Sequence, residues 1–426
     1  MNINTILKGM KCSHCGKEHK CDIECVIVEH GAIAHLTELC KEYNSILIVA
    51  DENTIGATHD KVDMALEAKI AHRVIFSGDS VLVPNEDAIN KVTKHLDKID
   101  LIVGVGSGVI QDLCKYVSHF EKIPYMIVAT APSMDGYAST GSAMILKGMK
   151  ETVPAGLPKA IIADTEVLKD APMEMIKAGY GDIIGKYSAL NDWWLSVAVN
   201  DEYFCEYISD TTYEMIEKTI NVAQGIIARD EDAIATLTEA LIVVGIMMSF
   251  ATNSRPASGS EHHLSHFFEI TGIVNGEKYL PHGIDVAYST IITARLRERL
   301  VKAPFPNEQF RLAREEYVAK MEKIYGAEVG RGCVALQDKV GNYQKNRIAL
   351  YHKKRKQIIE ILSRMPTPEK IQEILSYVGL DISELYRTYT KKKISDAIAY
   401  GKDLKDRYTV LWLNYDLFGE ENEAYI

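Results

Sequence analysis

Five short runs rich in isoleucine and valine dominate the first 165 residues and limit the folds open to this chain. Each run is bounded by Asp, Gly or Pro, and the windows Asp60–Ala71 and Glu86–Asp97 between them carry helical spacing of apolar residues. Continuous apolar strands that alternate with helices are typical of a parallel sheet covered on both faces. We therefore predict an α/β sheet with strands at Ser45–Ala50, Arg73–Phe76, Leu101–Val105, Tyr125–Ala129 and Ala160–Ala163.

The pattern changes after about Asp170, where few β-rich runs remain. Apolar residues now recur three and four positions apart, which is typical of amphipathic helices. A chain of 426 residues is also too long for one compact core. We therefore predict an α/β domain over residues 1–168 and an all-helical domain over 169–426. The expected helices are Ile176–Val199, Thr211–Arg229, Ala233–Ala251, Asp285–Leu300, Glu308–Tyr325 and Tyr343–Met365.

Composition excludes several classes of protein. A net charge of −11 argues against a general nucleic-acid binder, which needs a basic face to displace counterions from phosphates. We expect no membrane span, because no run reaches the ~18 consecutive apolar residues that one needs, and Ala240–Phe250 has the length of a buried core helix. The N-terminus does not resemble a secretory signal, and eight dispersed cysteines do not suggest a disulfide framework. These features favour a cytoplasmic enzyme.

Two turns at the ends of predicted strands carry residues suited to a dinucleotide. In VGVGSGVIQD (Val103–Asp112), glycines let backbone N–H groups approach a pyrophosphate at the start of a helix. In ATAPSMDGYAS (Ala129–Ser139), Thr130 and Ser133 offer hydroxyls to phosphate or ribose oxygens. The first turn lacks the standard GxGxxG spacing, and a plain tight turn explains it equally well.

Asp51 follows the first predicted strand, in the segment VADENT. A carboxylate there accepts hydrogen bonds from the adenosine ribose and repels a 2′-phosphate, which favours NAD over NADP. The alternative is that Asp51 caps a helix. Because the carboxyl ends of parallel strands meet at one edge, the three turns together predict one dinucleotide crevice.

The helical half contains residues typical of an open divalent-metal site. His262 and His266 in SGSEHHLSHFF are four apart and share one helix face, and His282 in LPHGID follows twenty residues after His262. Asp182 in GYGDIIGK stands at the expected opening of a helix. One carboxylate and two imidazoles leave room for water and substrate on the ion. Taken singly, each histidine is explained by a hydrogen bond to a buried carboxylate, and Asp182 by a helix cap.

Several motifs together resemble one family. They are GVGSGVIQD, TAPSMDGYAS, GYGD with Lys186, SRPASGSEHHLSH (Ser254–His266), PHG (Pro281–Gly283) and DRYTVL (Asp406–Leu411). In this order they resemble the sn-glycerol-1-phosphate dehydrogenases, and the bacterial branch most. That family is related to glycerol dehydrogenase, iron-dependent alcohol dehydrogenases and dehydroquinate synthase. The family's three-glycine turn is Gly-Ser-Gly here, which removes one close backbone approach at most.

The resemblance implies a dehydroquinate-synthase-like fold, in which a Rossmann-like sheet domain precedes a helical domain. It implies that Asp182, His262 and His282 bind one divalent metal, with nickel, zinc and iron all compatible. Asp135, Asp182 and His266 would contact substrate and act in catalysis. The residues that would line the NAD or NADP site are Asp51, Gly106, Ser107, Gly108, Val109, Ile110, Thr130, Ala131, Pro132, Ser133 and Ser139.

The activity implied is interconversion of sn-glycerol 1-phosphate and dihydroxyacetone phosphate by hydride transfer at C2. A small phosphorylated polyol would be the substrate, Lys186 and Arg255 are candidates for its phosphate, and the family suggests a homodimer acting in phospholipid biosynthesis. Two related activities stay open: a glycerol or other alcohol dehydrogenase, and a dehydroquinate-synthase-like lyase, whose Glu-His-His set differs from the Asp182 seen here. A metal-sensing protein without an enzymatic activity is the alternative of a different class.

That sensing alternative rests on the N-terminal residues Cys12, Cys15, His19, Cys21 and Cys25. Only one residue separates His19 from Cys21, which is too tight for standard zinc-finger spacing. We therefore interpret these residues as reduced cysteines in a hairpin.

Overall fold

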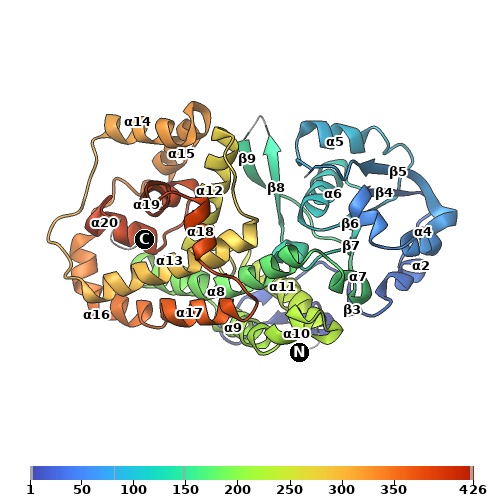
Figure 1. Ribbon diagram of the computed structural model, residues 1–426, viewed down its shortest axis with the longest axis horizontal. Coiled ribbons are helices and arrows are strands. Elements are labelled where there is room, and N and C mark those ends of the chain that lie inside the picture. The colour runs from blue at the N-terminus through green and yellow to red at the C-terminus, as the bar shows by residue number, and fades with distance from the viewer. Residues whose placement is uncertain (1–2, 81, 147–148, 423–425) are drawn as a thin grey trace. The chain divides into compact units, whose positions relative to one another are not determined.

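The computed structural model describes residues 3–80, 82–146, 149–422 and 426 (Figure 1). The chain forms two compact units: Met1–Ile183 with Asp210–Ser254, and Ile184–Ser209 with Arg255–Ile426. The first unit contains helices beyond the sheet, because α11 (Glu231–Ala251) packs against α7 (Thr165–Lys169). The domain boundary at 168–169, which follows the last strand, stays a prediction.

The first unit contains a six-stranded sheet. Its strands lie in the order β3-β10-β7-β6-β4-β5, and all paired strands run parallel. The five strands predicted from the Ile/Val runs are all present. The edge strand β3 was not predicted, although Cys25–Val28 is a short apolar run of the same kind. The strands are β3 Cys25–Glu29, β4 Ile46–Asp51, β5 Ile70–Phe76, β6 Leu101–Gly106, β7 Tyr125–Ala129 and β10 Ala160–Asp164.

Helices cover both faces of this sheet, which explains why its four central strands are buried almost throughout (Figure 1). Ile48 and Ala50 of β4 pack with α2 and α4 on one face, whereas Leu47 and Val49 pack with α5 and α6 on the other. Alternate side chains of one strand thus enter two separate cores. These helices are α2 Leu36–Leu39, α4 Lys61–Leu66, α5 Glu86–Thr93 and α6 Gly108–Glu121.

Two antiparallel hairpins complete the strands of the described residues. The first pairs β1 (Met10–Lys11) with β2 (Glu18–His19), and the second pairs β8 (Gly141–Leu146) with β9 (Met149–Pro154). Neither hairpin contains the long buried run that identified the parallel strands, so the second was not predicted. The first is the hairpin expected around the N-terminal cysteines, and all eight cysteines of the chain are free thiols.

Further helices of the first unit follow the sheet. The most apolar is α11, the only helix of the described chain that is long and apolar enough to cross a membrane; it is mostly buried inside the protein, as a core helix is. Two helices, α8 and α9, continue without a break from one unit into the other. The remaining bounds are α1 Ile3–Ile6, α3 Glu52–Gly56, α8 Met173–Asn200, α9 Glu206–Asn221 and α10 Ala223–Ile227.

The second unit is helical, as predicted, and α12 and α13 lie at its centre. α13 is buried along nearly its whole length and contacts α12, α16, α17 and α20. The apolar pattern did not reveal α15, which lies between two predicted helices, or α17–α20, which follow the last predicted one. The bounds are α12 Ser260–Asn275, α13 His282–Lys302, α14 Arg314–Tyr325, α15 Ala327–Val340, α16 Ile348–Leu362, α17 Pro368–Ser376, α18 Ser383–Thr388, α19 Lys391–Tyr400 and α20 Val410–Phe418.

Candidate functional site

The winding of the sheet changes direction between β4 and β6. The chain leaves β4 for its outer neighbour β5 and then returns to β6 on the opposite side, so the direction of winding reverses at this point. Ligands of open α/β sheets bind beyond the carboxyl ends of the strands at such a reversal. Asp51 ends β4 and Gly106 ends β6, so both stand at this edge as predicted.

Asp51 caps helix α3. Its Oδ1 accepts a hydrogen bond of 2.8 Å from the backbone N–H of Thr54. The Asp51 backbone N–H in turn donates to the Thr54 hydroxyl oxygen at 3.0 Å. The alternative interpretation of this residue as a helix cap is therefore confirmed. The cap uses one carboxylate oxygen, and contact with a ribose stays a prediction.

The Gly-Ser-Gly turn leads from β6 directly into α6. A methyl group at Gly106 would lie 2.6 Å from Ile110 Cβ, so the turn requires glycine for the close packing of strand and helix. The first backbone N–H groups of a helix have no partner within it and point toward anions. Ser107, Gly108 and Val109 stand in this first turn. Ile110 packs its side chain in the core, which leaves its backbone N–H as the group available to a phosphate.

The loop after β7 carries the second group of predicted cofactor residues. The Thr130 backbone N–H donates to Gly106 O at 3.2 Å, which ties this loop to the first turn. Ala131 O accepts from the Tyr137 hydroxyl at 2.8 Å and from the Ser133 backbone N–H at 3.0 Å. Pro132 lies so close to α8 that a methyl group at Gly179 would be 1.8 Å from Pro132 O. Glycine is thus required at 179.

Lys115 on α6 organises this loop, a role that was not predicted from the sequence. Its fully buried ammonium donates to Gly141 O at 2.8 Å, Gly136 O at 3.1 Å and Ser139 Oγ at 3.2 Å. Burial lowers the pKa of Lys115, and the charge of Asp112 opposes that shift. The predicted cofactor residue Ser139 is therefore held in place by a buried cation.

Asp135 and Asp182, the two predicted catalytic carboxylates, come together. The backbone N–H of Asp135, at the start of η3 (Asp135–Ala138), donates to Asp182 Oδ2 at 3.0 Å. The expectation that Asp182 opens a helix is wrong, since α8 begins at Met173. The glycines around Asp182 resemble a helix boundary in sequence, but Gly179 serves the close approach to Pro132.

Three histidines form a cluster on α12 and α13. The ring centroids of His262 and His282 are 5.1 Å apart, and the ring of His266 lies 6.1 Å from the first and 5.4 Å from the second. Ligand nitrogens of His262 and His282 lie within 4.8 Å of each other, and His266 is outside this ligand group. Burial holds the pKa of the neighbouring His263 well below its usual range.

Hydrogen bonds orient both members of the close pair. Glu261 Oε1 lies 2.7 Å from His262 Nδ1, and Ser265 Oγ lies 3.2 Å from His282 Nδ1. Burial raises the pKa of Glu261, but its hydrogen bond and attraction to His262 lower that pKa overall. Metal-binding histidines are commonly held through one ring nitrogen so that the other faces the ion. The pair fits a divalent metal in this respect. The role of Glu261 was not predicted from the sequence.

The start of α12 is fixed by Asp192 of α8. The backbone N–H of Ser260 donates to Asp192 Oδ2 at 2.7 Å, and Val410 N–H donates to Oδ1 at 2.8 Å. A methyl group at Gly259 would lie 2.7 Å from Ala189 Cα, so the segment before α12 packs directly on the α8 backbone. These contacts position the turn that carries His262.

One of the two suggested phosphate cations is already engaged. Arg255 forms hydrogen bonds with Glu202 at 2.7 and 2.6 Å, and a further one with Tyr408 O at 2.7 Å. Its guanidinium therefore serves the structure of the helical unit, and Arg255 is not retained as a candidate. Lys186 is fully buried on α8 and stays a prediction.

Several known proteins are similar to this chain. Residues 27–172 match the family model described as iron-containing alcohol dehydrogenase. A protein of Geobacillus stearothermophilus named NAD(P)+-dependent glycerol-1-phosphate dehydrogenase is 30% identical over 95% of this chain and 96% of its own length. This chain belongs to the glycerol-1-phosphate dehydrogenase family. A relative of the same name from Halalkalibacterium halodurans is also 30% identical, over 93% of this chain and 94% of its own.

Solved structures confirm the predicted dehydroquinate-synthase-like fold. A probable glycerol dehydrogenase from Sinorhizobium meliloti has a TM-score of 0.61 at 16% identity and covers 92% of each chain. An NADH-dependent butanol dehydrogenase from Thermotoga maritima has a TM-score of 0.60 at 16% identity, over 94% of this chain and 95% of its own. Family and fold together imply a nucleotide cofactor and a divalent metal.

Proposed function

We propose that this enzyme interconverts sn-glycerol 1-phosphate and dihydroxyacetone phosphate by hydride transfer at C2, with NAD(P) and a divalent metal. The full-length similarity to relatives of that name carries the proposal. The histidine pair on α12 and α13 and the glycine turn at the carboxyl edge of the sheet supply matching chemistry for the two cofactors. When bound, the metal acts as a Lewis acid that stabilises negative charge on the oxygen at C2.

Asp182, His262 and His282 are the proposed metal ligands. Gly185 follows Asp182 by less than one turn of α8, and a methyl group there would lie 2.5 Å from Val286 Cγ1 and 3.4 Å from Glu261 Cγ. This part of α8 thus lies against the first turns of α12 and α13, which carry His262 and His282. Nickel, zinc and iron all accept one carboxylate and two imidazoles.

The other predicted residues take roles around this set. Asp135 and His266 would orient the substrate hydroxyls, and His266 would also carry the proton of the C2 hydroxyl to solvent. The cofactor would bind along Asp51, Gly106–Ile110, Thr130–Ser133 and Ser139, with its pyrophosphate at the N-terminus of α6.

Asp51→Ser is expected to raise the use of NADP relative to NAD. A carboxylate beside the ribose repels a 2′-phosphate, and serine removes that repulsion. Serine is also a good N-cap, so α3 keeps its cap and the comparison reports on cofactor choice. The measurement is kcat/KM for both cofactors in wild type and variant. A wild type that already prefers NADP strongly would show that Asp51 does not contact the ribose.

His266→Ala is expected to lower kcat/KM by ~10²–10⁴-fold while metal content is unchanged. That range is typical of a lost general acid or base. His266 lies outside the ligand group formed by its two neighbours, so the ion should stay bound. Because His266 would carry the proton, the pH profile of kcat/KM should also change in this variant. Loss of the metal would instead make His266 a ligand, and unchanged kinetics would leave it no catalytic role.

The substrate is tested with metal-supplemented enzyme, NADH and dihydroxyacetone phosphate, followed by assignment of the product enantiomer. We expect sn-glycerol 1-phosphate, with dihydroxyacetone and simple aldehydes reduced far more slowly. Equal rates with and without the phosphate would favour a glycerol or alcohol dehydrogenase. Release of inorganic phosphate without net NADH oxidation would favour the lyase.

Three broader features are also proposed. We place the enzyme in the cytoplasm, in phospholipid biosynthesis, and expect a homodimer. Light scattering during gel filtration tests the dimer, and a single-chain mass would contradict it.

A further inference from the structure

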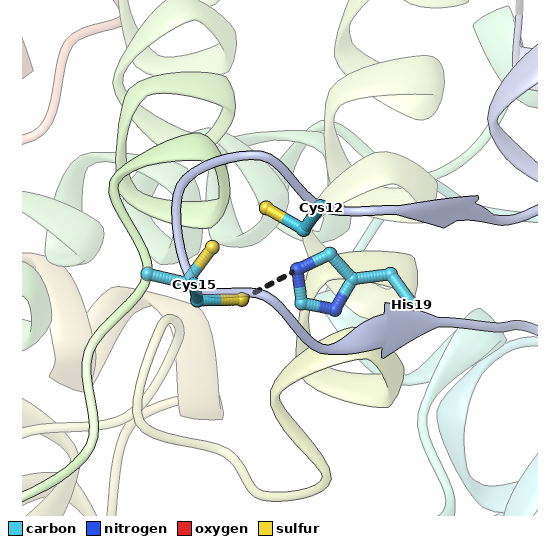
Figure 2. A group of neighbouring side chains, drawn as sticks. Cys12, Cys15 and His19 are labelled. Carbon is cyan, nitrogen blue, oxygen red and sulfur yellow. Dashed lines mark hydrogen bonds between the residues drawn. The ribbon is translucent and has the colours of Figure 1, made fainter.

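The N-terminal hairpin brings two thiols and an imidazole together in the first unit. Cys12 and Cys15 lie on the turn after β1, and His19 lies on β2 (Figure 2). Their Sγ and imidazole nitrogen atoms all lie within 4.8 Å of one another. Cys12 and His19 are buried, at 3% and 0% exposure, while Cys15 is half-buried. These residues are far in sequence from the histidines of α12 and α13.

The separation of these atoms suits a tetrahedral zinc ion. Cys15 Sγ lies 3.5 Å from His19 Nε2, and Figure 2 shows the two side chains directed at each other. Zn–S and Zn–N bonds of about 2.3 and 2.05 Å at the tetrahedral angle put the sulfur and nitrogen about 3.6 Å apart. The observed distance of 3.5 Å between Cys15 Sγ and His19 Nε2 therefore matches the separation expected for two ligands of one zinc ion.

The turn itself has the geometry that such a site needs. The Gly16 backbone N–H donates to Cys12 O at 2.9 Å, and Gly16 has φ +72°, a left-handed conformation that favours glycine. Cys12 N–H donates in turn to Lys17 O at 2.9 Å. The turn therefore holds Cys12 and Cys15 on one side of the hairpin.

The hairpin itself is small. Its strands have two residues each, and an isolated two-stranded hairpin is marginal in water. The ring of His19 stacks on Phe250 near the end of α11, with centroids 5.0 Å apart and planes 8° apart. A structural metal is a common addition to so small an element.

We propose that Cys12, Cys15 and His19 hold a structural zinc ion that stabilises the N-terminal hairpin of the first unit. Two thiolates and one imidazole are ligands that structural zinc sites use. Cys21 is not part of the set, so its short distance in sequence from His19 is no obstacle.

Cobalt replacement in the full-length enzyme tests this site. Cobalt bound by cysteine gives thiolate-to-metal charge-transfer absorption, which a site made of Asp182, His262 and His282 cannot give. We expect this absorption in wild type, in His282→Ala and in Cys25→Ser, and its loss in Cys12→Ser and Cys15→Ser. Zinc content should fall by about one equivalent per chain in the two latter variants. Absence of the absorption in wild type, or its survival in Cys15→Ser, would overturn the proposal.

A second measurement needs no variant and so does not depend on a variant's folding. Cys15 and Cys25 are both half-buried, which makes them a matched pair for alkylation of the native enzyme. Cys15 should react with iodoacetamide only after zinc is removed by a chelator, while Cys25 should react at the same rate before and after. Equal reactivity of Cys15 in both states, or a Cys12–Cys15 disulfide in the purified enzyme, would contradict the site.

Discussion

Alanine in place of His282 is expected to release the catalytic metal and to abolish turnover. His282 and His262 are the two imidazoles of the proposed ligand set, and both are oriented through Nδ1 by neighbouring side chains. With one imidazole gone, a single imidazole and one carboxylate remain to hold the ion. A Lewis acid contributes several kcal/mol of transition-state stabilisation, so kcat/KM should fall by about 10³-fold or more.

Elemental analysis of the purified variants measures the metal directly. Asp182→Ala and His262→Ala should behave like His282→Ala, each losing one metal per chain while cysteine-bound zinc remains. His263→Ala is the control, since His263 is adjacent to His262 on α12 but is fully buried outside the ligand group. Full occupancy of the metal in folded His262→Ala protein would rule out the ligand assignment.

The main features of the fold follow from patterns that are local in the sequence. Strands buried on both faces must be continuously apolar, so β4, β6, β7 and β10 stand out as Ile/Val runs. The edge strand β3 carries the short run Cys25–Val28 and was missed, and β8 of the hairpin β8–β9 alternates buried and partly exposed residues. The hydrophobic pattern therefore predicted all four central strands and the edge strand β5, but not β3.

Some residues of the candidate site could also be predicted from the sequence, and others could not. The i,i+4 spacing of His262 and His266 predicted a shared helix face, and α12 confirms it. Lys115, Glu261 and Asp192 were missed because their roles depend on backbone carbonyls, a ring nitrogen and helix N–H groups brought near by folding. The ion pair of Arg255 with Glu202 was likewise not evident from the motif that contains the arginine.

The largest effect on stability is expected from a buried ion pair of the helical unit, between Arg297 of α13 and Asp192 of α8. Their closest atoms are 2.8 Å apart, and the side chains are 2% and 0% exposed. Arg297 also donates to Asn191 Oδ1 at 2.8 Å. Arg297→Met would leave the Asp192 carboxylate buried without its cation. Such a change costs about 3–5 kcal/mol, because the desolvated charge loses its compensation.

Urea unfolding followed by far-UV circular dichroism gives the free energies for this comparison. Lys302→Met is the matched control on α13, because Lys302 is 75% exposed and its pair with Glu298 is 3.7 Å long, so it should cost less than about 1 kcal/mol. The double variant Asp192→Asn, Arg297→Met removes both charges and should recover part of the loss. Since Asp192 also receives the Ser260 N–H at the start of α12, Asp192→Ala should weaken metal binding at His262 as well. If Arg297→Met costs no more than Lys302→Met, the pair does not stabilise this unit.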